Sequence, residues 1–213
     1  MRIGILGWNW WAASSGRCSR AGHEVVFSYA HGMEKLMRLA KDAKGKARAG
    51  TPQEAAQAAD TVLLAVHWLH VDDVLHQAGN LSGMVTLTCS LPMDAGNTGL
   101  LIGRTTSGAE ELAKKVPKAK VVCAFNTVPS EVLFGVSAAC RQANRPSLVY
   151  CGDDASSKAV AAELIRDVGF EPADAGPLRI ARYTEPFALL VSQLAYEGTG
   201  GLELAYRFRL LGS

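Results

Sequence analysis

Short apolar runs alternate with amphipathic segments along almost the whole chain, and this order limits the fold more than any single motif. The apolar runs predict strands at residues 3–6, 24–28, 61–66, 85–88, 120–125, 148–151 and 171–174. The segments between them predict helices at residues 14–20, 33–44, 71–77, 108–116 and 156–168. Strands that alternate with helices form a mostly parallel sheet with helices on both faces. The chain is therefore predicted to be a doubly wound α/β protein.

Two helix starts have side chains suited to capping. Thr51 precedes Pro52 and stands three residues before Glu54, which is the pattern of a capping box with proline in the first turn. Asp154 stands just before the helix predicted at residues 156–168 and is expected to cap it.

The C-terminal part is expected to be helical from residue 178 onward, with interruptions at Pro186 and residues 198–201. We therefore divide the chain into a domain at residues 1–176 and a C-terminal helical segment at residues 177–213. The segment is rich in large apolar side chains, which need cover from the domain or from a second subunit. These are Tyr183, Phe187, Leu190, Leu194, Tyr196, Leu204, Tyr206 and Phe208.

Charge and composition exclude several partners. The net charge is only +2, so neither nucleic acid nor an anionic membrane surface is expected as a partner. The densest basic run, residues 41–48, is expected to be a solvated helix end and loop. No apolar segment reaches the ~20 residues that a membrane span requires. Glycines and Asn9 break the apolar run at residues 3–13, which argues against a signal peptide.

The five cysteines favour a reducing compartment. No two of them form a C-x-x-C pair, and Cys89, Cys123 and Cys151 stand in strand-like apolar runs. We therefore expect a cytoplasmic protein without a disulfide framework. No metal site is predicted, because no His or Cys pair has ligand spacing backed by a second pair.

The turn after the first strand is where dinucleotide-binding folds place a glycine-rich loop. This context predicts a Rossmann-type domain, but residues 7–12 read GWNWWA where G-x-G-x-x-G is typical. Asn tolerates left-handed backbone angles and Ala12 is small, so one interpretation is a degenerate loop that still binds. The alternative is that the tryptophans occlude the phosphate site. The candidate cofactor-binding residues here are Gly7, Trp8, Asn9, Trp10 and Trp11.

The end of the second strand indicates which cofactor is preferred. Enzymes that use NAD place an acid there, whereas residues 27–30 contain none. Ser28, His31, Lys35 and Arg38 offer a hydroxyl and positive charge that suit the 2′-phosphate of NADP(H). The alternative is an ordinary serine followed by a solvated helix face.

Several motifs occur together in a fixed order: MRIGILG, AGHEVV, LAV, SGAE, AFNTV and DAGPL, beginning at residues 1, 21, 64, 107, 124 and 174. In this combination the chain resembles the NADP oxidoreductases that depend on coenzyme F420. The resemblance implies a pyrophosphate over Gly7 and the loop after it, and a 2′-phosphate near Ser28. It also implies a nicotinamide at the strand end formed by Ala65, Val66 and His67. The family usually has Pro where His67 stands and further glycines within residues 9–12.

Candidate catalytic residues are few, as hydride transfer between two rings allows. His67 at a strand end is a candidate acid or base, although a polar loop contact also explains it. Asn126, with Thr127, is expected near the same junction, and Pro177 and Leu178 are expected to form a second wall.

The sequence therefore predicts an NADP(H)-dependent oxidoreductase that transfers hydride to a small-molecule acceptor, namely the deazaflavin coenzyme F420 or a similar ring. The alternatives are an NADPH reductase of a flavin, quinone or metal chelate, and a non-enzymatic Rossmann module whose nucleotide site is occluded. The resemblance further implies a homodimer. A loop with the family's glycines restored is expected to bind NADPH more tightly.

Overall fold

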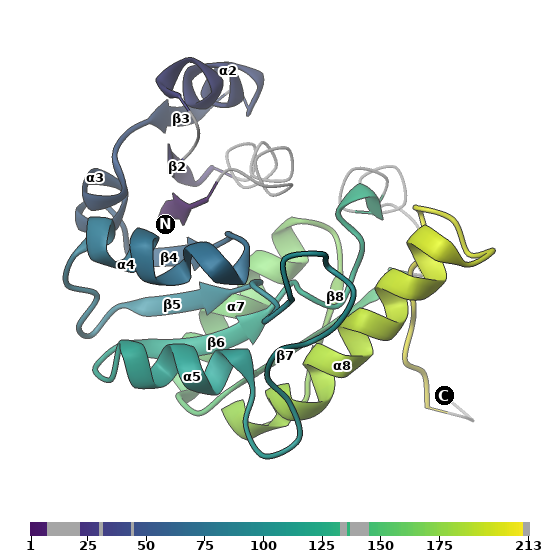
Figure 1. The fold of residues 1–213 in the computed structure, drawn as a ribbon. Coiled ribbons are helices and arrows are strands. Elements are labelled where there is room, and N and C mark those ends of the chain that lie inside the picture. Colours follow the sequence, from purple (N-terminus) through teal and green to yellow (C-terminus); the bar gives the residue numbers. More distant parts are fainter. Residues whose placement is uncertain (8–21, 30–31, 44, 133–135, 137–144, 211–213) are drawn as a thin grey trace.

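The computed structural model describes residues 1–7, 22–29, 32–43, 45–132, 136 and 145–210, and they form one eight-stranded sheet with helices on both faces. The strand order is β3-β2-β1-β4-β5-β6-β7-β8. Figure 1 shows α3, α4 and α5 in front of the sheet and α7 behind it. The predicted Rossmann-type fold is confirmed.

The strands are β1 (Arg2–Leu6), β2 (Glu24–Ser28), β3 (Lys46–Ala49), β4 (Thr61–Leu64), β5 (Val85–Thr88), β6 (Lys120–Ala124), β7 (Ser147–Gly152) and β8 (Glu171–Asp174). The α-helices are α2 (Met33–Ala43), α3 (Pro52–Gln57), α4 (Val71–Ala78), α5 (Gly108–Lys115), α7 (Ala155–Asp167) and α8 (Ala181–Ser192). Two 3₁₀ turns, η1 (Trp68–His70) and η2 (Leu178–Ile180), and a π-helical turn, η3 (Gln193–Glu197), complete the set.

Two hydrophobic cores lie on opposite faces of the sheet, because successive strand residues point to opposite sides. In β4, Leu63 packs into the core that also holds residues of α2 and α7. Its neighbours Val62 and Leu64 pack into the core beneath α3, α4 and α5. The central strands are therefore buried on both faces, as the apolar run at residues 61–66 predicts.

The direction of the strands determines where the ligand site can lie. β1 to β6 are mutually parallel. From β1 the chain first adds β2 and β3 on one side, and it then adds β4, β5 and β6 on the other side of β1. The carboxyl ends of β1 and β4 thus meet at the point where the strand order reverses, which is the usual ligand position in such sheets. β7 is antiparallel to β6, and β8 is parallel to β7.

Both predicted caps are present. Thr51 accepts a hydrogen bond from the backbone N–H of Glu54, whose carboxylate accepts from the N–H of Thr51 in return. Asp154 accepts from the N–H of Ser157 at 2.8 Å. The helix predicted at residues 14–20 lies outside the described residues.

Three local predictions are wrong. Residues 46–49, expected to be loop, form the edge strand β3, with Ala47 and Ala49 against the core and the two basic side chains more exposed. The helix is not interrupted at Pro186. α8 continues through this residue, and Glu185 and Ala188 are buried on the packed face of the helix. The helical pattern also stops early, since residues 198–210 contain no helix.

Candidate functional site

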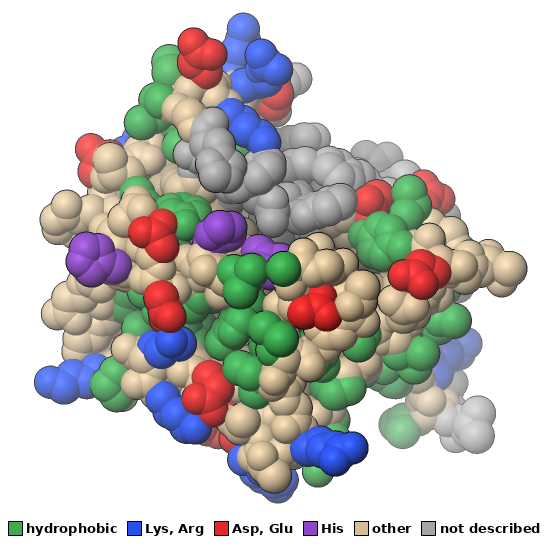
Figure 2. All heavy atoms as spheres, in the orientation of Figure 1, with side chains coloured by type: hydrophobic (Ala, Val, Ile, Leu, Met, Phe, Trp, Pro, Cys, Tyr) green, Lys and Arg blue, Asp and Glu red, His purple; other side chains and the backbone are tan. Residues whose placement is uncertain are grey.

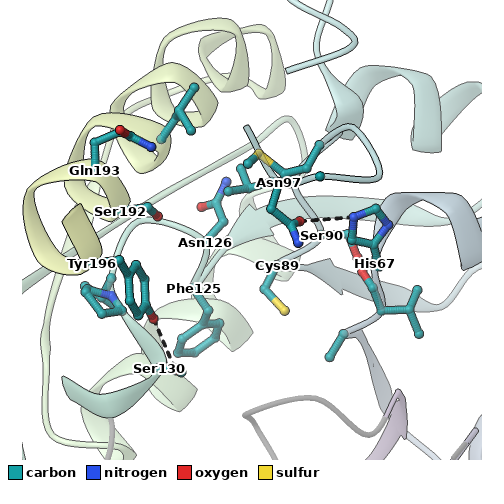
Figure 3. Close-up of a pocket in the computed structure, with 18 of the residues that line it drawn as sticks. His67, Cys89, Ser90, Asn97, Phe125, Asn126, Ser130, Ser192, Gln193 and Tyr196 are labelled. Carbon is teal, nitrogen blue, oxygen red and sulfur yellow. Dashed lines mark hydrogen bonds between the residues drawn. The ribbon is translucent and has the colours of Figure 1, made fainter. Parts of the chain in front are cut away.

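A cavity of about 540 Å³ opens at the carboxyl ends of β4, β5 and β6, between these strands and the end of α8. Its size falls within the ~300–1,000 Å³ typical of small-molecule sites. Figure 3 shows His67 and Cys89 on one side, Gln193 and Tyr196 on the other, and Asn126 between them. Its lining includes Ala65, Val66, His67, Cys89, Ser90, Leu91, Met93, Asn97, Phe125, Asn126, Val128, Pro129, Ser130, Leu189, Ser192, Gln193, Tyr196 and Glu197.

Gly7 lies where β1 ends against the end of β4. The N–H of Ala65 donates to the carbonyl of Leu6 at 2.9 Å, which draws the two chain segments together. Gly7 has φ of +149°, and a Cβ atom on it would overlap the backbone carbonyl of Ala65. Glycine is therefore required here for packing, before any nucleotide is considered. Trp8, Asn9, Trp10, Trp11 and His31, the other candidates of this region, lie outside the described residues.

Ser28, expected near a 2′-phosphate, is part of the packed interior. Its side chain is fully buried, and its hydroxyl donates to the carbonyl of Ile5 at 2.8 Å. The hydroxyl hydrogen is thus already used within the sheet, and a 2′-phosphate contact of Ser28 stays a prediction. The side chains of Lys35 and Arg38, in contrast, are exposed on α2.

Tyr29, directly after β2, is an uncharged residue at the position where an acid is typical of NAD enzymes. It has φ of +60°, and its hydroxyl donates to Asp73 at 2.6 Å. Burial and the neighbouring carboxylate together raise the pKa of Tyr29 to about 12. This hydroxyl therefore stays protonated and keeps the end of β2 attached to α4.

His67 is held by both of its ring nitrogens. The N–H of Leu69 donates to Nδ1 at 3.3 Å, so the ring hydrogen resides on Nε2, which lies 3.1 Å from Oδ1 of Asn97. Figure 3 shows this second contact as a dashed line. His67 caps η1 and joins the end of β4 to the loop that carries Asn97. The geometry favours a positioning role for His67 over the acid–base role that its sequence position suggested.

Asn126 enters the cavity from a strained turn. The preceding residue, Phe125, is buried and has φ of +71°, an uncommon conformation for an aromatic residue. The side-chain amide of Asn126 donates to Sγ of Cys123 at 3.3 Å. Its Oδ1 is buried and has no hydrogen-bond partner among the described residues. An unpaired acceptor that lines a cavity is suited to a ligand N–H or O–H group.

The opposite wall comes from the C-terminal segment. Tyr196, in the π-helical η3, donates to Glu131 at 2.7 Å and lies 3.4 Å from the hydroxyl of Ser130. π-Helical turns are rare and are frequent at functional sites. Sequence reasoning did not identify this group of residues. The available signals were only the aromatic content and the glycines after Glu197.

Three residues expected near the cavity lie elsewhere. Thr127 is buried and bonded to the hydroxyl of Tyr206 at 2.6 Å. Pro177 and Leu178 do not form the second wall, and Leu178 is part of the core beneath α5. Because β8 runs opposite to β6, the chain that follows it emerges at the other edge of the sheet.

One group of potential metal ligands occurs within the described ranges: His23, Glu163 and Asp167, whose ligand atoms lie within 4.8 Å of one another. Both imidazole nitrogens of His23 already have partners, the amino group of Met1 at 3.1 Å and Asp167 at 2.7 Å. The group lies at the amino end of β2, across the sheet from the cavity, and the network accounts for its geometry without an ion.

Comparison with known proteins finds a family match in the first part of the chain. Residues 2–92 match the family model described as NADP oxidoreductase, coenzyme F420-dependent. The family model covers β1 to β5 and the Gly7–Ala65 junction, and it supports an NAD(P)-dependent oxidoreductase. The resemblance inferred from the motifs is thus confirmed.

The chain is also 30% identical over 194 residues to Metalloreductase STEAP3 of Rattus norvegicus. The match covers 90% of this chain and 37% of that protein, so the chain spans little more than a third of the relative's length. None of the described helices is long and apolar enough to cross a lipid bilayer.

Two solved structures have the same fold over nearly the whole chain. One, from Arthrobacter sp. FB24, is described as an F420-dependent NADP reductase. It has a TM-score of 0.84 and 22% identity, with 98% of this chain and 99% of that chain covered. The other is the hypothetical protein SMa0349 from Sinorhizobium meliloti. It has a TM-score of 0.71 and 25% identity, with 98% and 95% covered.

Proposed function

We propose that this protein is an NADP(H)-dependent oxidoreductase that transfers hydride between NADPH and a small acceptor in the cavity at the carboxyl ends of β4 to β6. The observation that carries the proposal is the composition of this cavity. Ala65, Val66 and His67 come from the part of the chain that matches the NADP oxidoreductase family, whereas Asn126 and Tyr196 come from the part beyond it. The nicotinamide and the acceptor would therefore meet between the two parts.

On this proposal the chain binds and orients the two reactants. NADPH, when bound, supplies the hydride. The adenosine end would lie over the end of β2, where Lys35 and Arg38 offer positive charge to a 2′-phosphate. The nicotinamide would lie beside Ala65, and Oδ1 of Asn126 would accept a hydrogen bond from its carboxamide. Holding two rings face to face supplies much of the rate enhancement in such reactions.

Several acceptor classes are open: a deazaflavin, a flavin, a quinone and a metal chelate. The family description favours a deazaflavin, coenzyme F420. The name of the rat relative, a metalloreductase, favours a metal chelate instead. A non-enzymatic Rossmann module is the competing account, because three tryptophans stand in a loop where G-x-G-x-x-G is typical and can occlude the phosphate site. We further propose a homodimer that works in the cytoplasm.

The test is the rate of NADPH oxidation with a panel of acceptors, in the native chain and in Asn126→Leu. Removing Oδ1 of Asn126 leaves an N–H of the nicotinamide carboxamide unpaired, which costs about 1–3 kcal/mol. We therefore expect kcat/KM for NADPH to fall about tenfold or more. Thr184→Val is the matched control, because it removes another buried, unpartnered oxygen that does not line the cavity. Equal kcat/KM in the native chain and Asn126→Leu, with both folded by circular dichroism, would remove Asn126 from the site. Absence of NADPH binding would overturn the proposal itself.

A further inference from the structure

The charge of the cavity lining restricts which acceptor can bind, given the function proposed above. Of the residues that line the cavity, none is lysine or arginine, and one, Glu197, is a carboxylate. Glu197 is exposed at the end of η3 and accepts a hydrogen bond from the amide of Gln193 at 3.2 Å. Within the described part of the chain, the cavity thus offers an anion neither a lysine nor an arginine.

A second carboxylate lies directly behind the same wall. Glu131 accepts hydrogen bonds from the hydroxyls of Ser130 at 2.6 Å and Tyr196 at 2.7 Å, and both donors line the cavity. Burial opposes ionisation, but the two hydrogen bonds outweigh it and hold the pKa of Glu131 below its usual value. The hydroxyl hydrogens of Ser130 and Tyr196 are therefore directed at Glu131 and away from a ligand.

Uncharged side chains make up the rest of the acceptor side, with Asn97, Ser192 and Gln193 as its polar members. Leu91, Met93, Val128, Pro129 and Leu189 surround the space between the strand ends and α8. Apolar walls favour a flat, uncharged ring by excluding water from both of its faces. A phosphate or carboxylate group would instead lose its hydration next to Glu197 without gaining an opposite charge.

We infer that this cavity takes an uncharged, planar aromatic carbonyl acceptor, a quinone without acidic substituents, in preference to an acceptor that carries phosphate or carboxylate groups. In the reaction, NADPH transfers a hydride to the quinone and becomes NADP⁺. One proton from water at the open mouth of the cavity completes the hydroquinone. Coenzyme F420 carries phosphate and carboxylates on its side chain, so the charge of this wall opposes that acceptor.

The experiment compares two acceptors that differ in charge, 2-methyl-1,4-naphthoquinone and 1,4-naphthoquinone-2-sulfonate, under anaerobic conditions with saturating NADPH. The measured quantity is the ratio of kcat/KM for the neutral acceptor to that for the sulfonate. Their intrinsic reactivities differ, but this difference cancels when the ratio is compared between variants. The variants are Glu197→Gln, Glu197→Lys and, as a matched control for charge reversal, Glu163→Lys on the far edge of the sheet.

We expect the ratio to fall about threefold in Glu197→Gln and about tenfold in Glu197→Lys, as a charge several ångströms from the acceptor at a solvated site allows. The ratio is expected to stay unchanged in Glu163→Lys. The effect should shrink at high salt, because added ions screen exposed charges, whereas a purely steric effect would not.

A ratio that does not respond to Glu197→Lys, or a native chain that reduces neither quinone while binding NADPH, would overturn the inference and leave the proposed function standing. Binding of NADPH is measured first by fluorescence titration in every variant. A native chain that binds no NADPH overturns the proposed function, and the inference fails with it.

Discussion

Among single residues, Gly7 is required for the packing of β1 against the end of β4. Its backbone conformation and its contact with Ala65 both exclude a side chain. Gly22 is the natural comparison, because it also has positive φ, +93°, but a Cβ atom there would meet no atom within 4 Å.

Gly7→Ala is therefore expected to lower the free energy of unfolding by at least about 2 kcal/mol, since overpacking adds to the backbone strain. Gly22→Ala is expected to cost about 1 kcal/mol, the strain alone. Urea unfolding of both variants measures the difference. Equal losses would mean that the β1–β4 contact yields to a methyl group and that Gly7 is not needed for packing.

Residues differ in how far the sequence could predict their roles. The strand-turn context located Gly7 at the end of the first strand, where dinucleotide-binding folds place a glycine-rich loop, and its contact with a pyrophosphate stays a prediction. The role of Ser28 could not be predicted, because its hydroxyl bonds to Ile5, a partner 23 positions away in the sequence. His67 was identified as a site residue, but its contact with Asn97 depends on a loop conformation that no local pattern encodes.

At the scale of elements, α8 is joined to α5 by a buried carboxylate. Glu185 is 1% exposed, and its oxygens accept hydrogen bonds from the N–H groups of Gly108 and Ala109 at 2.8 and 2.9 Å. These are free donors of the first turn of α5, which the carboxylate satisfies from another element. Burial raises the pKa of Glu185 to about 7, although the two N–H donors oppose the shift.

This raised pKa predicts a stability that depends on pH. Between about pH 4.5 and pH 7 the folded chain holds a proton on Glu185 that the unfolded chain has lost, so the free energy of unfolding falls as pH rises. The full loss amounts to about 3 kcal/mol. In Glu185→Gln this term is absent, so the stability advantage of the native chain over the variant should be smaller at pH 8 than at pH 5. Urea unfolding at the two pH values measures it. An advantage that grows with pH would contradict the account.

The elements themselves were largely predictable, with exceptions that have physical causes. The caps of α3 and α7 use neighbours in sequence, so their patterns were reliable. The reversed direction of β7 and β8 was not predicted, because the composition of a strand does not determine its pairing direction. Because of this reversal, the second wall of the cavity is formed by the end of α8 and not by residues 177–178.

At the scale of the whole molecule, the packed and exposed faces of α8 suggest a second subunit. Tyr183, Leu190 and Leu194 are 66%, 54% and 48% exposed, and their spacing places them on one side of the helix. Phe208 and Leu210 in the C-terminal segment are also exposed. Figure 1 shows α8 along the outside of the sheet, on the side where the C-terminus lies. Figure 2 shows apolar side chains gathered on the visible face near the histidines.

We predict a dimer that uses the exposed face of α8. Light scattering should return about twice the chain mass of 22.6 kDa, and Leu190→Glu should reduce it to one chain mass, because a charge would be buried in the interface. Met37→Glu, at an equally exposed position on α2, should leave the mass unchanged. A native chain that scatters as a monomer across micromolar concentrations would rule the dimer out.

Calorimetric titration of the native chain with NADPH and with NADH tests whether the junction of β1, β2 and β4 binds NADP(H). Residues 27–30 at the end of β2 include no acid, whereas Lys35 and Arg38 are exposed on α2 nearby. We expect NADPH to bind at least about tenfold more tightly than NADH, a difference of about 1.4 kcal/mol, at one salt concentration. Equal affinities would contradict the assignment of NADPH, and no heat of binding with either nucleotide would contradict the account as a whole.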